Sequence, residues 1–137
     1  SKSDPSDLSR INMSDDATSI AQKFRKAKTD PDALPSEEAG LENRPEARNL
    51  VAIYAALEDQ SVDAVLNDIG GRQFSEFKPM LIDRAVATLS PISAEMNRLM
   101  QDPDEIDRVL ANGAERARKI AQPILNQTYD IMGLLRS

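Results

Sequence analysis

The sequence of 137 residues contains no cysteine and no histidine. Without cysteine the chain can form no disulfide, offers no thiol nucleophile and cannot build a cysteine-ligated zinc site. Without histidine it lacks the commonest general base and the commonest metal ligand, so a serine–histidine–aspartate site is impossible. No apolar run approaches the roughly 18 residues of a membrane span, so no contact with a membrane is expected. These absences favour a binding function over catalysis by this chain alone.

The charge balance is acidic, with 17 basic and 23 acidic side chains and a formal net charge of −6. Because phosphate repels an acidic chain, binding of RNA would need a local basic surface or contacts to base edges. The acid excess lies mainly in residues 49–102, which hold 4 basic and 8 acidic residues. The two ends are therefore the better candidates for contact with phosphate. A cytoplasmic location is the default expectation.

Apolar residues recur at helical spacing along most of the chain, and no stretch alternates long enough to form a strand. Ser14, Ser61 and Asp102 are expected to cap helices, and Pro45 is expected at a first helical position. Residues 1–15 have no helical period and predict a loop. The fold class expected is all-α: an antiparallel bundle of five to six helices around one core, with an extended amino-terminal loop.

Three apolar stretches are expected to supply most of the core. Residues 49–57 are apolar on nearly every side and predict the most buried helix. A second stripe runs from Phe74 to Leu99. The third stripe comprises Ile106, Val109, Leu110, Ala114, Ala117, Ile120, Ala121, Ile124 and Leu125.

Four polar residues near the carboxy terminus lie away from that third stripe, at helical steps of four, four and three: Arg108, Asn112, Arg116 and Lys119. Such a face can bind phosphates, and Arg or Asn can also read unpaired base edges. An ordinary solvated face with an internal Glu115–Lys119 pair fits the same residues.

Other charged clusters have simpler explanations. Arg44 and Arg48 flank a loop and a helix start, and they are a further possible contact for RNA. For Lys23, Arg25, Lys26 and Lys28, compensation of the negative helix end is the favoured account. Among the acids, neither Asp4 with Asp7 nor Asp102 with Asp104 and Asp107 has the spacing of a calcium loop, so no metal site is predicted.

A resemblance to a known family runs through the whole sequence. Ser1-Lys2-Ser3 is similar to the end of the Lys-Met-Ser-Lys-Ser signature of class I aminoacyl-tRNA synthetases. The continuation from Asp4 to Asn12, and later segments such as Arg44-Pro45-Glu46-Ala47-Arg48, Asn112-Gly113-Ala114-Glu115-Arg116 and Asp130-Ile131-Met132-Gly133, resemble bacterial-type tryptophanyl-tRNA synthetases.

The resemblance implies roles for the first residues. Lys2 would be the catalytic lysine, which stabilises negative charge on the pyrophosphate leaving ATP, and Ser1, Lys2 and Ser3 would bind ATP. The first Lys and the Met of the signature are missing. The chain is therefore expected to be a carboxy-terminal fragment that starts within this loop, with residues 1–15 as the loop remnant and 16–137 as a helical domain that binds the tRNA anticodon.

The family implies the rest of the functional expectation. The fragment would bind tryptophan-specific tRNA but form no adenylate alone and need no cofactor, because the nucleotide-binding catalytic domain is absent. The intact enzyme, a homodimer, would use ATP and Mg²⁺ to join tryptophan to its tRNA. Without that domain, residues 1–15 are expected to be disordered. The alternatives are a helical protein–protein interaction module with no RNA role, and a related tyrosyl enzyme.

Overall fold

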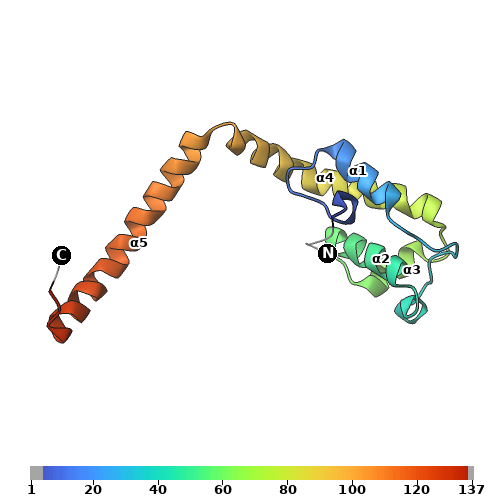
Figure 1. Cartoon of the computed structure of the whole chain (residues 1–137). Coiled ribbons are helices and arrows are strands. Elements are labelled where there is room, and N and C mark those ends of the chain that lie inside the picture. Colours follow the sequence, from blue (N-terminus) through green and yellow to red (C-terminus); the bar gives the residue numbers. More distant parts are fainter. Residues whose placement is uncertain (1–4, 136–137) are drawn as a thin grey trace. The chain divides into compact units, whose positions relative to one another are not determined.

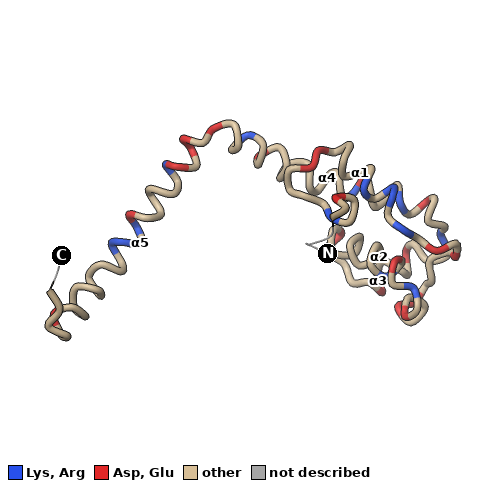
Figure 2. Tube along the Cα trace, in the orientation of Figure 1, with Lys and Arg blue, Asp and Glu red and all other residues tan. Residues whose placement is uncertain are grey.

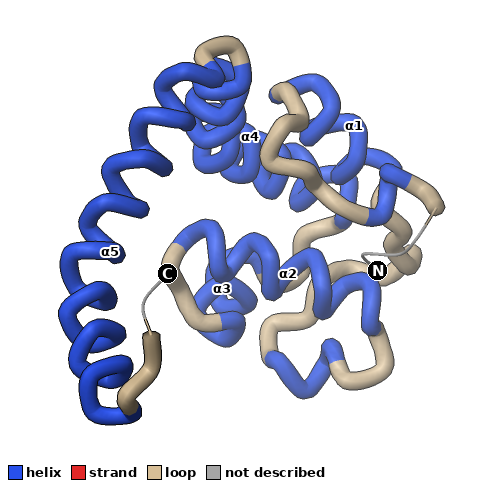
Figure 3. The backbone as a smooth tube through the Cα atoms, turned by 60° about the vertical axis from the view of Figure 1, so that its left-hand side comes forward, coloured by secondary structure: helices blue, strands red, loops and turns tan. Residues whose placement is uncertain are grey.

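The computed structural model describes residues 5–135, and all regular structure in that range is helical (Figures 1 and 3). The α-helices are α1 (Ala17–Lys26), α2 (Pro45–Glu58), α3 (Val62–Ile69), α4 (Phe74–Met100) and α5 (Pro103–Met132). Two short 3-10 helices, η1 (Asp7–Ser9) and η2 (Glu38–Leu41), lie in the loops before α1 and α2. The predicted all-α class is confirmed, and no described helix is both long and apolar enough to cross a bilayer.

The starts of α3 and α5 follow the capping signals in the sequence. Ser61 Oγ accepts a hydrogen bond from the backbone N–H of Ala64 at 3.2 Å, and Asp102 Oδ1 accepts one from Glu105 at 3.1 Å. These side chains satisfy backbone donors that the first turn of a helix leaves free. Both predicted caps are therefore confirmed.

The predicted start of α1 is wrong by two residues. The cap is Asp16, whose Oδ1 accepts a hydrogen bond from the backbone N–H of Ser19 at 2.7 Å, and Ser14 lies exposed in the preceding turn. Three acceptable capping residues stand in a row here, and Asp15 is engaged elsewhere by Lys23. The choice of cap thus depends on a contact that the local sequence does not show.

The chain divides into two compact units, Ser1–Met96 and Asn97–Ser137. The core lies in the first unit and draws its buried side chains from α1 to α4 and the loop before α2. Phe77 is fully buried and meets the ring of Tyr54 edge-on, with centroids 5.5 Å apart. The prediction that α2 is buried on nearly every side is wrong, because Ala52 and Ala56 are exposed.

The long stripe of α4 is buried only in its first half. Phe77, Leu81 and Ala85 are fully buried, whereas Ile92 and Met96 are exposed. The change of environment falls within one uninterrupted helix, which continues through Pro91. The core therefore ends near the middle of α4.

The apolar stripe of α5 does not join a core. No residue of α5 is buried, and its largest apolar side chains, such as Val109, Leu110, Ile120 and Ile124, are each more than 60% exposed. The unit Asn97–Ser137 contains only α5 and the last turn of α4, so it supplies no second apolar helix face for the stripe to pack against. The expectation of a single core shared by all helices is wrong for this structure.

Candidate functional site

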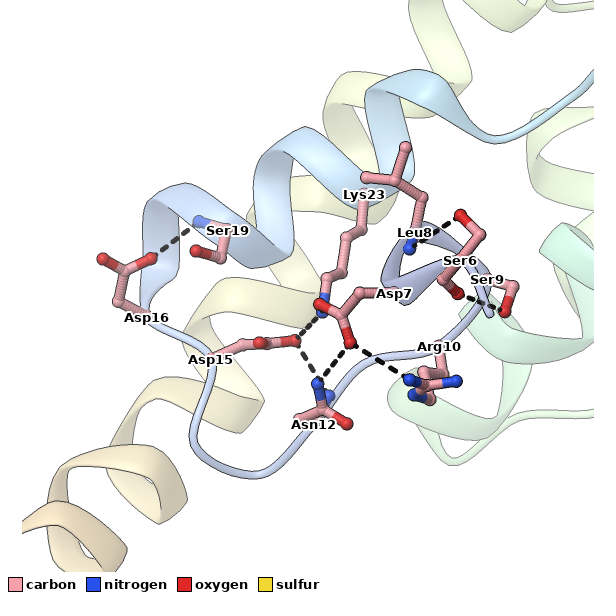
Figure 4. Close-up of polar contacts among 10 residues, drawn as sticks. All are labelled: Ser6, Asp7, Leu8, Ser9, Arg10, Asn12, Asp15, Asp16, Ser19 and Lys23. Carbon is pink, nitrogen blue, oxygen red and sulfur yellow. Dashed lines mark hydrogen bonds and ion pairs between the residues drawn. The ribbon is translucent and has the colours of Figure 1, made fainter. Parts of the chain in front are cut away.

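The loop before α1 is fixed at its base by a cluster of polar residues, Asp7, Asn12, Asp15 and Lys23, which we call the Lys23 cluster (Figure 4). Lys23 Nζ lies 2.8 Å from Asp7 Oδ2 and 2.6 Å from Asp15 Oδ2. Asn12 completes the ring, since its Nδ2 donates to Asp7 at 2.9 Å and its backbone N–H donates to Asp15 at 2.8 Å. One ammonium group on α1 therefore binds both ends of the loop.

Burial and charge give this cluster its stability. The side chain of Lys23 is only 7% exposed, and that of Asp15 is 11% exposed. Burial lowers the pKa of Lys23, but the hydrogen bonds to Asp15 and Asp7 together outweigh this effect and leave the pKa above its ordinary value. Hydrogen bonds from Lys23 and Asn12 hold the pKa of Asp7 below its usual value. All three groups are therefore charged at neutral pH.

Beneath the loop lies a hollow of about 360 Å³ with a mostly apolar lining. Leu8 and Ile11 of the loop line one side, and Phe24, Leu50 and Leu89 are among the residues of α1, α2 and α4 that line the other. Ile11 packs against the edge of the core, whereas Leu8 is 46% exposed. Apolar packing therefore holds the loop only in part, and the Lys23 cluster holds its two ends.

This arrangement corrects the expectation that residues 1–15 have no attachment to the rest of the chain. Residues 5–15 form η1 and bind α1 through Lys23. The reasoning from the sequence was wrong because it counted apolar residues and overlooked the buried ion pairs. The residues implied in catalysis and ATP binding, Ser1, Lys2 and Ser3, lie outside the described residues.

Arg44, predicted as a possible RNA contact, is engaged within the chain. Its Nε donates to Asp30 Oδ2 at 2.9 Å, its Nη1 donates to the carbonyl of Ala33 at 2.8 Å, and its Nη2 donates to the carbonyl of Asp32 at 2.9 Å. The side chain is 17% exposed, and its guanidinium lies 6.0 Å from the ring centroid of Phe74. Arg44 thus fixes the loop before α2.

Arg48 lies one turn further along α2 and has a different environment. Its Nη2 lies 3.2 Å from Glu38 Oε1, and both side chains are well exposed. An exposed pair of this kind is easily exchanged for another partner, because solvent weakens the attraction. Arg48 is therefore open to an external ligand, whereas Arg44 is not.

The structure brings the predicted residues of α5 together on one exposed face. Arg108, Asn112 and Arg116 line the same shallow hollow, together with Glu105. Figure 2 shows how sparsely charges follow one another along this helix. Lys119 lies one turn beyond and pairs with Glu115 at 2.8 Å, as the alternative interpretation expected. We call Arg108, Asn112, Arg116 and Lys119 the α5 polar face.

Glu105 would repel a phosphate at the start of this face, but Arg98 neutralises it. The two Nη atoms of Arg98 donate to the two carboxylate oxygens of Glu105 at 2.7 and 2.9 Å. These hydrogen bonds from Arg98 hold the pKa of Glu105 below its usual value. The guanidinium groups of Arg108 and Arg116 therefore set the charge of this surface.

Sequence reasoning missed two buried lysines. Lys23 was interpreted as a cation at a helix end, although it shares a helix face with Ile20 and Phe24 and could have been recognised as inward-facing. Lys78 donates to the carbonyls of Arg25 and Ala27 at 3.1 and 2.6 Å and so binds the end of α1, and burial lowers its pKa. Its partners lie about 50 positions away, where no sequence signal points to them.

No group of three or more carboxylates gathers into a possible metal site within residues 5–135. The interactions that organise this part of the chain are ion pairs and hydrogen bonds between protein groups. No step of a reaction can therefore be assigned to a metal held here.

Comparisons with known proteins give a consistent result. The family model described as tRNA synthetases class I (W and Y) matches residues 1–90. Tryptophan–tRNA ligase of Agrobacterium fabrum is 59% identical over 136 residues, which cover 99% of this chain and 38% of the relative. The enzymes of that name from Rhizobium meliloti and Brucella melitensis are 60% and 58% identical, over 99% and 100% of this chain. The chain spans less than two fifths of the length of these relatives.

Proposed function

The chain belongs to the class I tRNA synthetases of the tryptophan and tyrosine group, in their bacterial tryptophanyl branch, and from this premise we propose that it is the helical tRNA-binding part of a tryptophan–tRNA ligase. In this proposal the α5 polar face binds the anticodon arm. The acceptor end of the tRNA then reaches an active site built by the rest of a longer enzyme. The function of this chain is binding, and the chemistry belongs to the complete ligase.

One observation carries the proposal. The similarity to tryptophan–tRNA ligases extends through α5, beyond the region matched by the family model, and α5 exposes two arginines and an asparagine on one face. Arginine binds phosphate with paired donors, and arginine or asparagine can hydrogen-bond to the edges of unpaired bases. An anticodon loop offers both kinds of group.

The complete ligase would use ATP and Mg²⁺ to activate tryptophan. In that step a carboxylate oxygen of tryptophan bonds to the α-phosphorus, and the bond between this phosphorus and the bridging oxygen of pyrophosphate breaks. By resemblance Lys2 would stabilise the charge that grows on the leaving pyrophosphate. We expect no tryptophan-dependent exchange of pyrophosphate into ATP by the 137-residue chain alone. Exchange well above the blank would contradict this expectation.

Titration with three RNAs tests the binding function: tryptophan tRNA, the same tRNA with an altered anticodon, and an unrelated tRNA. Each titration is made at two salt concentrations, because phosphate contacts make affinity fall as salt rises. We expect binding that weakens with salt and drops when the anticodon changes. If the complete ligase binds tryptophan tRNA but is indifferent to its anticodon, the assignment to the anticodon arm is wrong.

The exposed apolar stripe of α5 favours a second candidate, a helix that packs against another protein surface. Val109, Leu110 and Ile120 are each more than 60% exposed, which is unusual for a run of large apolar side chains on one helix. An interaction module would show no binding to any of the three tRNAs, in the chain or in the complete protein. The same titrations therefore separate the two functions.

A further inference from the structure

We propose that Lys23 is a positioning residue for amino-acid activation, which fixes the segment that leads to Lys2 relative to α1. The inference rests on the proposed function, since it assigns a role within the reaction of the complete ligase. Nothing in the resemblance assigns a role to this lysine. The argument comes from the geometry of the Lys23 cluster.

The first step is that Lys23 joins two separate points of the chain. Asp7 lies sixteen residues before it and Asp15 eight residues before it, yet both carboxylates lie within 2.8 Å of the same nitrogen. Figure 4 shows the side chain reaching from α1 to both acids. The position of Asp7 is therefore coupled to a helix whose opposite face packs in the core.

The second step is that little else holds Asp7 in place. The side chain of Asp7 is 58% exposed, the neighbouring Leu8 is 46% exposed, and the hollow lies beneath the stretch that follows. Arg10 also approaches Asp7, but at 3.6 Å and on the exposed side of the loop. The buried ammonium of Lys23 is thus the principal group that locates Asp7.

The third step concerns reach. Asp7 follows Lys2 by five residues, and five residues span at most about 18 Å even when fully extended. Fixing Asp7 therefore limits the region that the Lys2 ammonium can explore. Because a misplacement of about 1 Å can reduce a rate by roughly 100-fold, loss of this restraint should appear mainly in the rate of the chemical step.

The test uses the complete ligase and four variants. Lys23→Met removes the ammonium, Lys23→Arg keeps the charge, and Asp7→Asn changes an exposed partner whose replacement leaves the core intact. Lys26→Met, at an exposed position of the same helix, is the matched control. For each enzyme, tryptophan-dependent pyrophosphate exchange gives kcat and KM, and tRNA affinity and thermal unfolding report on the fold.

We expect Lys23→Met and Asp7→Asn to lower kcat about tenfold or more, with the KM for tryptophan and the tRNA affinity within about twofold of the original enzyme. Lys23→Arg should recover most of the loss, and Lys26→Met should leave kcat unchanged. If Lys23→Met fails to fold, Asp7→Asn decides the outcome.

Two results would overturn the inference while the proposed function stands. The first is an active ligase whose kcat is unaffected by Asp7→Asn and by a folded Lys23→Met. The second is a fall in kcat matched by equal losses of tRNA affinity and thermal stability, because that pattern indicates a merely structural role. A complete ligase with no exchange activity before any substitution would instead refute the proposed function.

Discussion

The guanidinium of Arg44 binds the carboxylate of Asp30 through two of its nitrogens, with Nε 2.9 Å from Oδ2. Further donors reach the carbonyls of Asp32 and Ala33, so one side chain holds the loop from residue 30 to residue 33 against the start of α2. That loop ends next to Leu34, which is 2% exposed. Arg44 therefore supports the core indirectly, by fixing the segment that delivers Leu34.

Replacement of Arg44 by Met should lower the free energy of unfolding by about 2 kcal/mol, because it leaves the partly buried carboxylate of Asp30 without its main donor. Arg48→Met is the control, since the exposed Arg48–Glu38 pair should contribute no more than about 0.5 kcal/mol. Urea unfolding followed by circular dichroism measures both values. Equal effects from the two substitutions would show that Arg44 is not the residue that fixes this loop.

The stability contributed by Asp30 should depend on pH. Hydrogen bonding from Arg44 lowers the pKa of Asp30 in the folded chain below its value of 3.8 in the absence of such contacts. A carboxyl group with a depressed folded pKa contributes its full stability above the unfolded pKa and loses it as the pH falls through the folded pKa. The contribution should therefore be complete at neutral pH and disappear in strong acid.

Asp30→Asn tests this dependence. The variant should be less stable than the original chain at pH 7, and the difference should shrink as the pH is lowered towards about 2, where Asp30 is protonated in both states of the original chain. Urea unfolding at several pH values measures the difference. A gap that stays constant over this range would mean that the charge of Asp30 does not contribute to stability.

The amino-terminal cap of α1 gives a direct comparison of two neighbouring residues. Asp16→Ala should cost about 1 kcal/mol, because it removes the acceptor for the backbone N–H of Ser19. Ser14→Ala should change stability by less than about 0.5 kcal/mol, since Ser14 is exposed and caps no helix. Thermal or urea unfolding of the two variants distinguishes the observed cap from the one that the sequence suggested. A larger loss from Ser14→Ala would place the helix start two residues earlier.

These contacts show how far sequence reasoning could reach. The caps Ser61 and Asp102 bind backbone groups three residues away, so the local sequence was sufficient to predict them. Lys23 and Arg44 bind acids between eight and sixteen residues away, across loops whose path is set by tertiary packing. Their types and charges were visible in the sequence, but their partners were not.

The stripe on α5 shows a different limit. Its apolar spacing correctly predicted a long amphipathic helix, from Pro103 to Met132. Periodicity shows that a helix has an apolar face, but it does not specify the surface that covers this face. In the part of the chain that the structure describes, α5 has no buried residue. Sequence alone thus gave the helix and its faces but not their environment.

The α5 polar face leads to the most specific prediction about tRNA. Arg108→Gln and Arg116→Gln should each weaken the binding of tryptophan tRNA. If each arginine contacts one phosphate of a single-stranded loop, each change should also reduce the slope of log affinity against log salt by about 0.7. Asn112→Ala should instead reduce the preference for the correct anticodon with little change in the slope, because an amide carries no charge. Titration at several salt concentrations separates the two effects.

Arg118→Gln is the control for these variants because it removes the same charge from the same helix. Residue 118 follows Arg116 by two positions, which turns its side chain about 200° around the axis, away from the α5 polar face. If binding depends on that face, Arg118→Gln should change the affinity much less than Arg116→Gln does. If the two substitutions weaken binding equally, the tRNA responds to the total charge of α5. Residues of the α5 polar face would then have no special role, and the exposed Arg48 on α2 would be the next position to substitute.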